Sequence, residues 1–247
     1  FYSGVATSGG SLDDLNAVKL FIPLRAMTAT DGKYPNTTTY GHTKTALDNA
    51  ITGLNAHNDT YSIGKGTLAE TAGNTVAGGW WHKSTYQNQM WLDGAYMGPA
   101  LFAELVNYSG KTTNIDSSND WDLIVKQFTI LRNMCWNPTD KLLYHAFAAD
   151  GGTNSTSHSD TWAGLSSKSP YVFHSASYWG RAVGWYFLAL VDILEQMEKA
   201  NLSSSTGYTT LKGYLAETAD GLKARQDQAT GGWYQILDKD GTYSASE

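Results

Sequence analysis

Two stretches of the sequence combine ionisable side chains with tryptophan and glycine. In the first, the run GGWWHK at residues 78–83 precedes QMWLDGAYM at residues 89–97. In the second, residues 178–186 read YWGRAVGWY. Aromatic faces pack against the C–H faces of sugar rings while neighbouring polar groups bind the hydroxyls. Rings in glycine-rich loops beside His, Arg, Gln and Asp therefore indicate a saccharide cleft.

Asp93 is the candidate for proton transfer in the first stretch. If a helix begins near Leu92, Asp93 and Met97 share a face, and Trp91 reaches the same cleft from the non-helical residue before the helix. Desolvation by the rings favours the protonated carboxyl, whereas the positive end of the helix favours the carboxylate. A second carboxylate nearby favours the protonated form. The alternative is that Asp93 is an N-cap that satisfies backbone N–H groups.

Arg181 is the candidate for anion binding in the second stretch. Arg181 and Trp185 are four residues apart and face the same way on a helix, and Gly180 and Gly184 permit close approach beside them. An arginine on an otherwise apolar helix requires an anion. That anion is either a structural Asp or Glu or the carboxylate of an acidic sugar.

Other polar residues give weaker signals. His145 follows the run LLY and is a third candidate, and Asp13 and Asp14 begin the first helix, where they either cap it or project into a cavity. The remaining histidines considered have no pattern that separates them from surface residues: His42, His57, His158 and His174. Three tryptophans are expected in the core: Trp121, Trp136 and Trp162. We find no metal motif, phosphate-binding loop or Ser-His-Asp signature, so no metal and no cofactor is implied.

Helices are expected to position these residues, because apolar residues recur at helical spacing while strand alternation is scarce. The expected helices are at about 12–29, 43–57, 89–107, 119–135, 176–199 and 209–226. Glycine pairs at 78–79 and 231–232 run directly into aromatic pairs. Helix, long aromatic loop, helix and short connection, repeated about three times, is typical of a helical toroid whose loops form one rim. We expect residues 153–170 to form an extended surface loop.

Composition excludes several classes. The chain has 247 residues and a net charge of −6, so it has no electrostatic footprint for nucleic acid or an anionic membrane. No linker divides it, which predicts one domain over residues 1–247. The longest apolar stretch, 182–194, contains Asp192 and is shorter than the roughly 18 residues that a membrane span needs. We expect a soluble protein without nucleic-acid or membrane partners.

The compartment is predicted from glycosylation sequons, since the lone Cys135 permits no intrachain disulfide. Five Asn-X-Ser/Thr sequons are present, at Asn36, Asn58, Asn107, Asn154 and Asn201. They favour a secreted, N-glycosylated eukaryotic protein, and the alternative is chance accumulation in a Ser/Thr-rich chain. The sequence given has no initiator Met and no signal peptide, so we expect a mature or trimmed chain.

Taken together, residues 79–83, 89–97, 179–185 and 232–238, with LDDLN at 12–16, resemble glycoside hydrolase family 105, the unsaturated rhamnogalacturonyl hydrolases. The resemblance implies an all-α, (α/α)6-barrel fold with its catalytic acid/base on Asp93. A second active-site carboxylate falls on Asp13, with Asp14 as the alternative. It implies pocket positions at His82, Trp91, His145, Arg181 and Trp185. The same motifs supply further expected substrate-binding residues: Trp81, Gln89, Met97, Trp179 and Trp233.

The family barrel has twelve helices and the pattern gives six. We therefore expect this chain to be the central part of the barrel, with terminal helices absent, and to associate through exposed inner faces.

The resemblance implies a hydrolase that removes a 4,5-unsaturated uronic acid from the nonreducing end of lyase-generated pectin oligosaccharides, by hydration of the vinyl ether. Rival interpretations are an inverting glycosidase that uses Asp93 and Asp13 on a saturated bond, and a sugar-binding protein without turnover. The sugar on the leaving side stays open.

Overall fold

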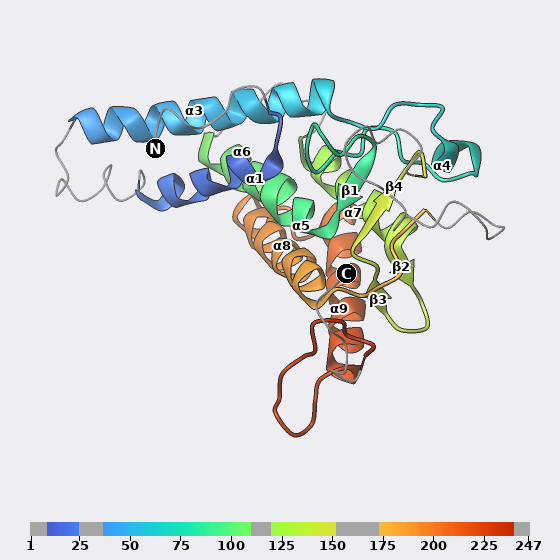
Figure 1. Cartoon of the computed structure of the whole chain (residues 1–247). Helices are drawn as coiled ribbons and strands as arrows, with labels where there is room; N and C mark the ends of the chain where they lie inside the picture. The colour runs from blue at the N-terminus through green and yellow to red at the C-terminus, as the bar shows by residue number, and fades with distance from the viewer. Residues whose placement is uncertain (1–8, 25–36, 110–119, 152–172, 240–247) are drawn as a thin grey trace.

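Helices dominate the computed structural model, which describes residues 9–24, 37–109, 120–151 and 173–239 (Figure 1). The helices are α1 (Leu12–Asn16), η2 (Ala17–Leu20), α3 (Thr37–Thr60), α4 (Leu68–Thr71), α5 (Leu92–Ala95), η3 (Tyr96–Ala100), α6 (Leu101–Ser109), α7 (Asp120–Cys135), α8 (Gly180–Lys199) and α9 (Thr206–Ala224). The strands are β1 (Gln89–Trp91), β2 (Trp136–Asn137), β3 (Leu142–Leu143) and β4 (Ala146–Ala148). The predicted all-α class is confirmed.

Each expected helix has a counterpart, with one correction at the first candidate stretch. Residues 89–91 form strand β1 and not the first turn of a helix, because they pair antiparallel with β4, Gln89 opposite Ala148 and Trp91 opposite Ala146. The helix that follows is continuous from α5 through η3 to α6. Its middle turn, η3, is a π-helix that contains Pro99, whose missing N–H cannot complete the α-helical hydrogen bond.

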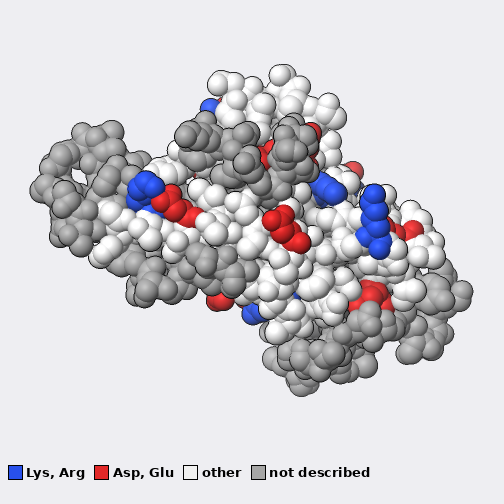
Figure 2. Space-filling model, turned by 90° about the horizontal axis from the view of Figure 1, so that it is seen from above, with Lys and Arg blue, Asp and Glu red and all other residues white. Residues whose placement is uncertain are grey.

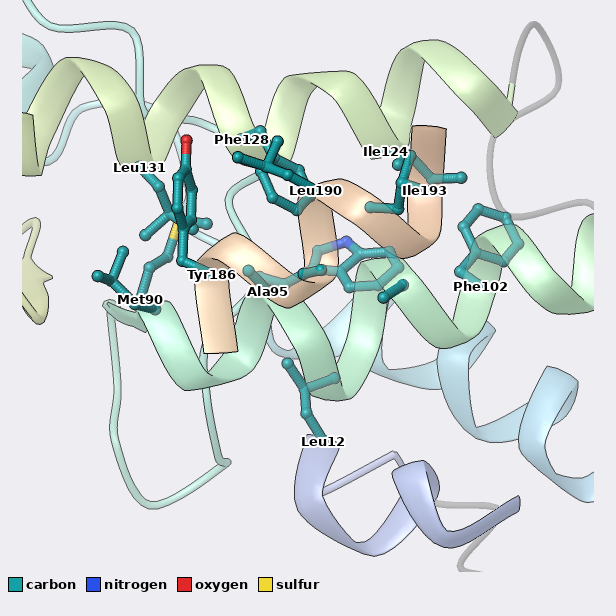
Figure 3. Close-up of a cluster of buried hydrophobic side chains, with 14 of the residues drawn as sticks. Leu12, Met90, Ala95, Phe102, Ile124, Phe128, Leu131, Tyr186, Leu190 and Ile193 are labelled. Carbon is teal, nitrogen blue, oxygen red and sulfur yellow. The ribbon is translucent and has the colours of Figure 1, made fainter. Parts of the chain in front are cut away.

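The core joins the helices that carry the two candidate stretches (Figure 3). Phe128 of α7 and Tyr186 of α8 contact at 5.3 Å between ring centroids, and Leu12 of α1 is buried against the same cluster. The other labelled side chains of this cluster are Met90, Ala95, Phe102, Ile124, Leu131, Leu190 and Ile193. Burial of these large apolar groups holds α5 against α8 and α1 against η3.

The arrangement brings together the starts of two helices. In Figure 1, α3 crosses one side of the molecule, α9 lies at the other, and α5, α6 and α8 lie between them. Because α5 packs on α8, Asp93 and Arg181, each the second residue of its helix, lie near one another. Among the described residues, α4 and β1 lie between α3 and α5, and β2, β3 and β4 follow α7.

Charge distribution and helix apolarity bear on the partners expected for this protein. On the face drawn in Figure 2, acidic and basic side chains of the described residues are interspersed. Within the four described ranges, no helix has the length and apolarity to cross a membrane. The expected surface loop at 153–170, which includes His158 and Trp162, lies outside the described residues, as do the sequons at Asn36 and Asn154.

Candidate active site

A pocket of about 360 Å³ opens where the candidate stretches meet. Its lining comes from α1, from the loop before β1, from β1 and α5, and from α8. The lining residues are Asp13, His82, Lys83, Tyr86, Trp91, Asp93, Arg181 and Trp185. Two carboxylates, two cations, an imidazole and three aromatic rings thus converge from three parts of the sequence, at 13, 82–93 and 181–185.

Asp13 is held by two basic side chains. Its Oδ2 lies 2.8 Å from Nζ of Lys83 and 3.5 Å from Nε2 of His82. The hydrogen bond from His82, assisted by Lys83, holds the pKa of Asp13 far below its ordinary value although partial burial opposes it. The hydrogen bond between Lys83 and Asp13 also raises the pKa of Lys83. Asp13 is therefore a fixed negative charge at neutral pH.

Backbone pairing delivers Asp13 to these partners. The amide of Leu12 donates to the His82 carbonyl at 3.2 Å, and the amide of Ser84 donates to the Gly10 carbonyl at 2.7 Å. These two backbone hydrogen bonds form a short ladder between the 10–12 and 82–84 segments, and the ladder places Asp13 beside His82 and Lys83. Asp14, one residue further, is exposed and is not a lining residue.

Asp93 has a different environment. Its Oδ1 lies 3.2 Å from Nη2 of Arg181, while its Oδ2 is buried and has no hydrogen-bond partner among the described residues. The Asp93 side chain is 12% exposed, whereas that of Arg181 is 63% exposed. Trp91, with extended backbone, occupies the cap position of α5, so Asp93 lies inside the helix and the N-cap interpretation is wrong. The anion beside Arg181 in this structure is the candidate catalytic carboxylate itself.

Aromatic rings form one wall of the pocket. The rings of His82, Tyr86 and Trp91 are nearly parallel, with centroids 5.3–6.1 Å apart. The indole N–H of Trp91 donates to Oε1 of the buried Gln89 at 3.0 Å, and His145 meets Trp91 edge-on at 5.8 Å. These contacts fix the face that Trp91 presents to the pocket. Burial lowers the pKa of His145, which favours its neutral form.

A partly buried ion cluster supports Trp185. Trp185 contacts Tyr96 at 4.6 Å between ring centroids, and the Lys19 ammonium lies 3.6 Å from the centroid of the Tyr96 ring. Lys19 also pairs with Glu104 at 3.5 Å and Asp192 at 3.4 Å. Desolvation lowers the pKa of Lys19 and raises that of Glu104.

The structure brings six of the expected site residues to the pocket and leaves six outside its lining. Those that line it are Asp13, His82, Trp91, Asp93, Arg181 and Trp185. Gln89, His145 and Trp179 lie behind the lining, where Gln89 contacts Trp91 and the His145 ring contacts both Trp91 and Trp179. Trp81 and Met97 pack against the core. Trp233 is exposed on the loop after α9, and its indole N–H donates to the Leu222 carbonyl.

Gly180 and Gly184 differ in their surroundings. A Cβ on Gly180 would meet the Tyr234 carbonyl at 3.0 Å, so this glycine admits the returning loop. Gly184 faces open space beside Arg181 and Trp185.

Lys83 and Tyr86 line the pocket and were missed as site residues. Lys83 directly follows His82, and its proximity to Asp13 depends on a pairing between distant segments that no local pattern reveals. His57 was expected to resemble a surface residue, and this is wrong, because it is fully buried. His174 is also half-buried, stacked on Tyr144 at 3.9 Å.

Of the tryptophans expected in the core, Trp121 and Trp136 pack against it. Within the described residues there is no group of three His, Cys, Asp or Glu side chains placed to hold a metal ion.

A helical fold whose pocket sets two carboxylates among aromatic rings suits a protein that acts on carbohydrate. Residues 59–247, more than half of the chain, match the family described as Glycosyl Hydrolase Family 88. The chain belongs to this family, and the resemblance to family 105 is confirmed by solved structures.

One solved relative is a glycoside hydrolase from family 105 of C. acetobutylicum ATCC 824. It is 26% identical with a TM-score of 0.67, over 96% of this chain and 55% of that protein. A possible member of the GH105 family from Klebsiella pneumoniae is 17% identical with a TM-score of 0.57, over 93% of this chain and 48% of that protein. The chain thus spans about half the length of these relatives.

Proposed function

We propose that the pocket is the active site of a hydrolase that removes a 4,5-unsaturated uronic acid from the nonreducing end of an oligosaccharide. The observation that carries this proposal is the pair of Asp93 and Arg181. A buried carboxyl with one oxygen that has no partner in the described ranges can transfer a proton, and an exposed guanidinium beside it can bind the carboxylate of the sugar. Family membership supports a glycoside hydrolase.

The chemistry is acid-catalysed hydration of a vinyl ether. The Asp93 carboxyl gives its proton to C4, the alkene electrons form the new C–H bond, and positive charge develops at C5 and the ring oxygen. Water then forms a bond to C5 and loses a proton to the Asp93 carboxylate, which restores the acid. The resulting hemiketal opens and the aglycone leaves as an alcohol, so the net reaction consumes one water.

Arg181 lies beside the proton-transfer group and is open to the substrate. Without substrate, its guanidinium lies 3.2 Å from Oδ1 of Asp93. Because the guanidinium is largely exposed, it can also bind the uronate carboxylate and hold the alkene of the sugar beside Asp93.

Asp13, His82 and Lys83 serve as the polar half of the site. Lys83 and His82 keep Asp13 ionised, and the carboxylate is free to accept hydrogen bonds from sugar hydroxyls or the attacking water. Trp91 and Trp185 offer ring faces to the sugar.

A labelled-water experiment tests the mechanism. Hydration of the alkene leaves the solvent oxygen on C5, whereas inverting hydrolysis by Asp93 and Asp13 leaves it on the anomeric carbon. We expect the label at C5 and no reaction with saturated galacturonides. Label on the anomeric carbon would favour the inverting glycosidase. Tight binding of unsaturated disaccharides without any loss of their double-bond absorbance would favour the sugar-binding protein.

The rhamnogalacturonan substrate, the secreted location and an oligomeric state are parts of the same proposal. Among the described sequons, Asn201 is exposed in the turn after α8. The side-chain amide of Asn107 instead donates to the backbone and side-chain oxygens of Gln196 at 2.7 and 2.9 Å, and Oδ1 of Asn58 accepts from the indole N–H of Trp80. In a secreted eukaryotic protein we therefore expect a glycan at Asn201, detectable by peptide mass spectrometry, and none at Asn107.

A further inference from the structure

His57 occupies a buried position with two acceptors. Its Nδ1 lies 2.5 Å from the carbonyl oxygen of Gly9, and its Nε2 lies 2.7 Å from the carbonyl oxygen of Trp81. The side chain belongs to α3 and is fully buried. A neutral imidazole has one N–H and one lone pair, so it can donate to only one of these carbonyls. Only the imidazolium satisfies both.

The two carbonyls belong to the segments that build the Asp13 side of the pocket. Gly9 lies so close to α3 that a Cβ there would meet the Gly53 carbonyl oxygen at 2.2 Å, and its φ of +65° is left-handed. From Gly9 the chain continues into the ladder that places Asp13 beside His82 and Lys83. From Trp81 the chain continues directly to those two partners. His57 thus ties both segments to α3.

We propose that His57 is a positioning residue of the pocket, whose imidazolium holds the 9–12 and 81–84 segments together and whose deprotonation loosens the ladder that sets Asp13 against Lys83. In the neutral ring, one nitrogen lone pair faces a carbonyl oxygen, and that contact has to lengthen. The segment that moves is either 9–12, which leads directly to Asp13, or 81–84, which contains His82 and Lys83.

The surroundings set the direction of the response. Burial lowers the pKa of His57, the two carbonyl contacts raise it, and a positive His82 lowers it further. Tyr61, the residue directly after α3, contacts the His57 ring, and Trp80 meets it edge-on. The 9–11 segment brings no ionisable side chain. We therefore expect the ladder to be tightest on the acidic side of the ordinary histidine pKa of about 6.5 and looser above it.

Amide hydrogen exchange in the unmodified chain tests this without substrate. The exchange rates of the Leu12 and Ser84 amides report the ladder. The Ala69 amide, which donates to the Ala149 carbonyl, is the internal control. ¹⁵N-labelled histidine reports the protonation of His57. We expect the protection factors of Leu12 and Ser84 to fall about tenfold as His57 loses its proton, with Ala69 unchanged. Protection that stays constant through this titration, a joint fall at all three amides, or no titration of His57 between pH 4 and 8 overturns the proposal.

Variants separate His57 from His82, which also contacts Asp13. In His57→Gln, whose amide can donate to one carbonyl, we expect low, pH-independent protection at Leu12 and Ser84 and a Lys83 pKa closer to its ordinary value. His42→Gln, an exposed position on the same helix, is the matched control and should behave as wild type. A folded His57→Gln chain with the wild-type pH response would assign the effect to His82 and reject the proposal. If His57→Gln does not fold, the measurements on the unmodified chain decide.

Discussion

The two carboxylates of the pocket differ in how they are held. Asp13 is 38% exposed and lies beside Lys83 and His82, and backbone hydrogen bonds of Gly10 and Leu12 fix the segment that leads to it. Among the described residues, Asp93 is buried, has one partner, and leaves one oxygen unpartnered. Its partner, Arg181, is largely exposed and can turn to another anion. One carboxylate is a fixed charge beside two basic side chains, and the other is buried beside an arginine that can also bind the substrate.

The largest expected effect follows from removing the proton donor. Asp93→Asn keeps the shape of the side chain but cannot donate the proton to C4, so we expect kcat on an unsaturated disaccharide to fall at least about 10³-fold. Loss of the double-bond absorbance measures the rate, and circular dichroism checks the fold. Asp14→Asn, at an exposed carboxylate outside the pocket, is the control. An Asp93→Asn chain within tenfold of wild type would transfer the proton-donor role to another group.

The exchange of anions at Arg181 gives the second effect. Arg181→Gln removes the charge that binds the uronate, so we expect KM to rise about 10–100-fold, the cost of a lost charge-assisted contact. Initial rates on an unsaturated disaccharide measure KM, and an Arg181→Gln chain with the wild-type KM would place the uronate contact elsewhere.

The third effect separates charge from proton transfer. Asp13→Asn leaves the acid in place but removes the charged acceptor for sugar hydroxyls and the attacking water, so we expect kcat to fall about tenfold. Since the pKa of Asp13 is lowered in the folded state, its stabilisation is present above pH 4 and is lost as acid titrates the folded carboxylate. Denaturant unfolding should therefore show Asp13→Asn less stable than wild type at pH 7, with a gap that closes on acidification.

Local sequence patterns predicted the helices and much of the pocket because these residues lie next to the elements that position them. Arg181 and Trp185 share one helical face, and Asp93 directly follows the start of α5, as spacing predicted. That these residues meet in one cavity was implied by the family resemblance and follows from the packing of α5 on α8. The strand at 89–91 was missed because its partner, β4, lies more than fifty residues further along the chain. Periodicity within one segment carries no information about such a partner.

The other misses have the same physical origin. Lys83 and His57 both contact the 9–13 segment, which is far from them in the sequence. Asp13 pairs with Lys83, and the Gly9 carbonyl oxygen contacts the His57 ring. Trp233 shows the converse limit: its motif is glycine-aromatic, yet its N–H is used locally by Leu222 and the ring faces solvent. A sequence motif identifies the side chain, but it does not reveal which distant segment packs over that side chain.

The smallest expected effect compares these two kinds of tryptophan. Trp185 lines the pocket and is supported by Tyr96, so Trp185→Ala should raise KM about tenfold through the lost ring face. Trp233→Ala removes an exposed ring that does not line the pocket, and we expect less than about a threefold change with the terminal unsaturated disaccharide. Longer unsaturated oligosaccharides sharpen the comparison, because a leaving-side chain that reaches the loop after α9 would raise the Trp233→Ala effect with each added sugar. A Trp233→Ala loss as large as that of Trp185→Ala on the disaccharide would mean that this loop closes over the pocket, and that the two carboxylates work under a cover that the 225–238 loop supplies.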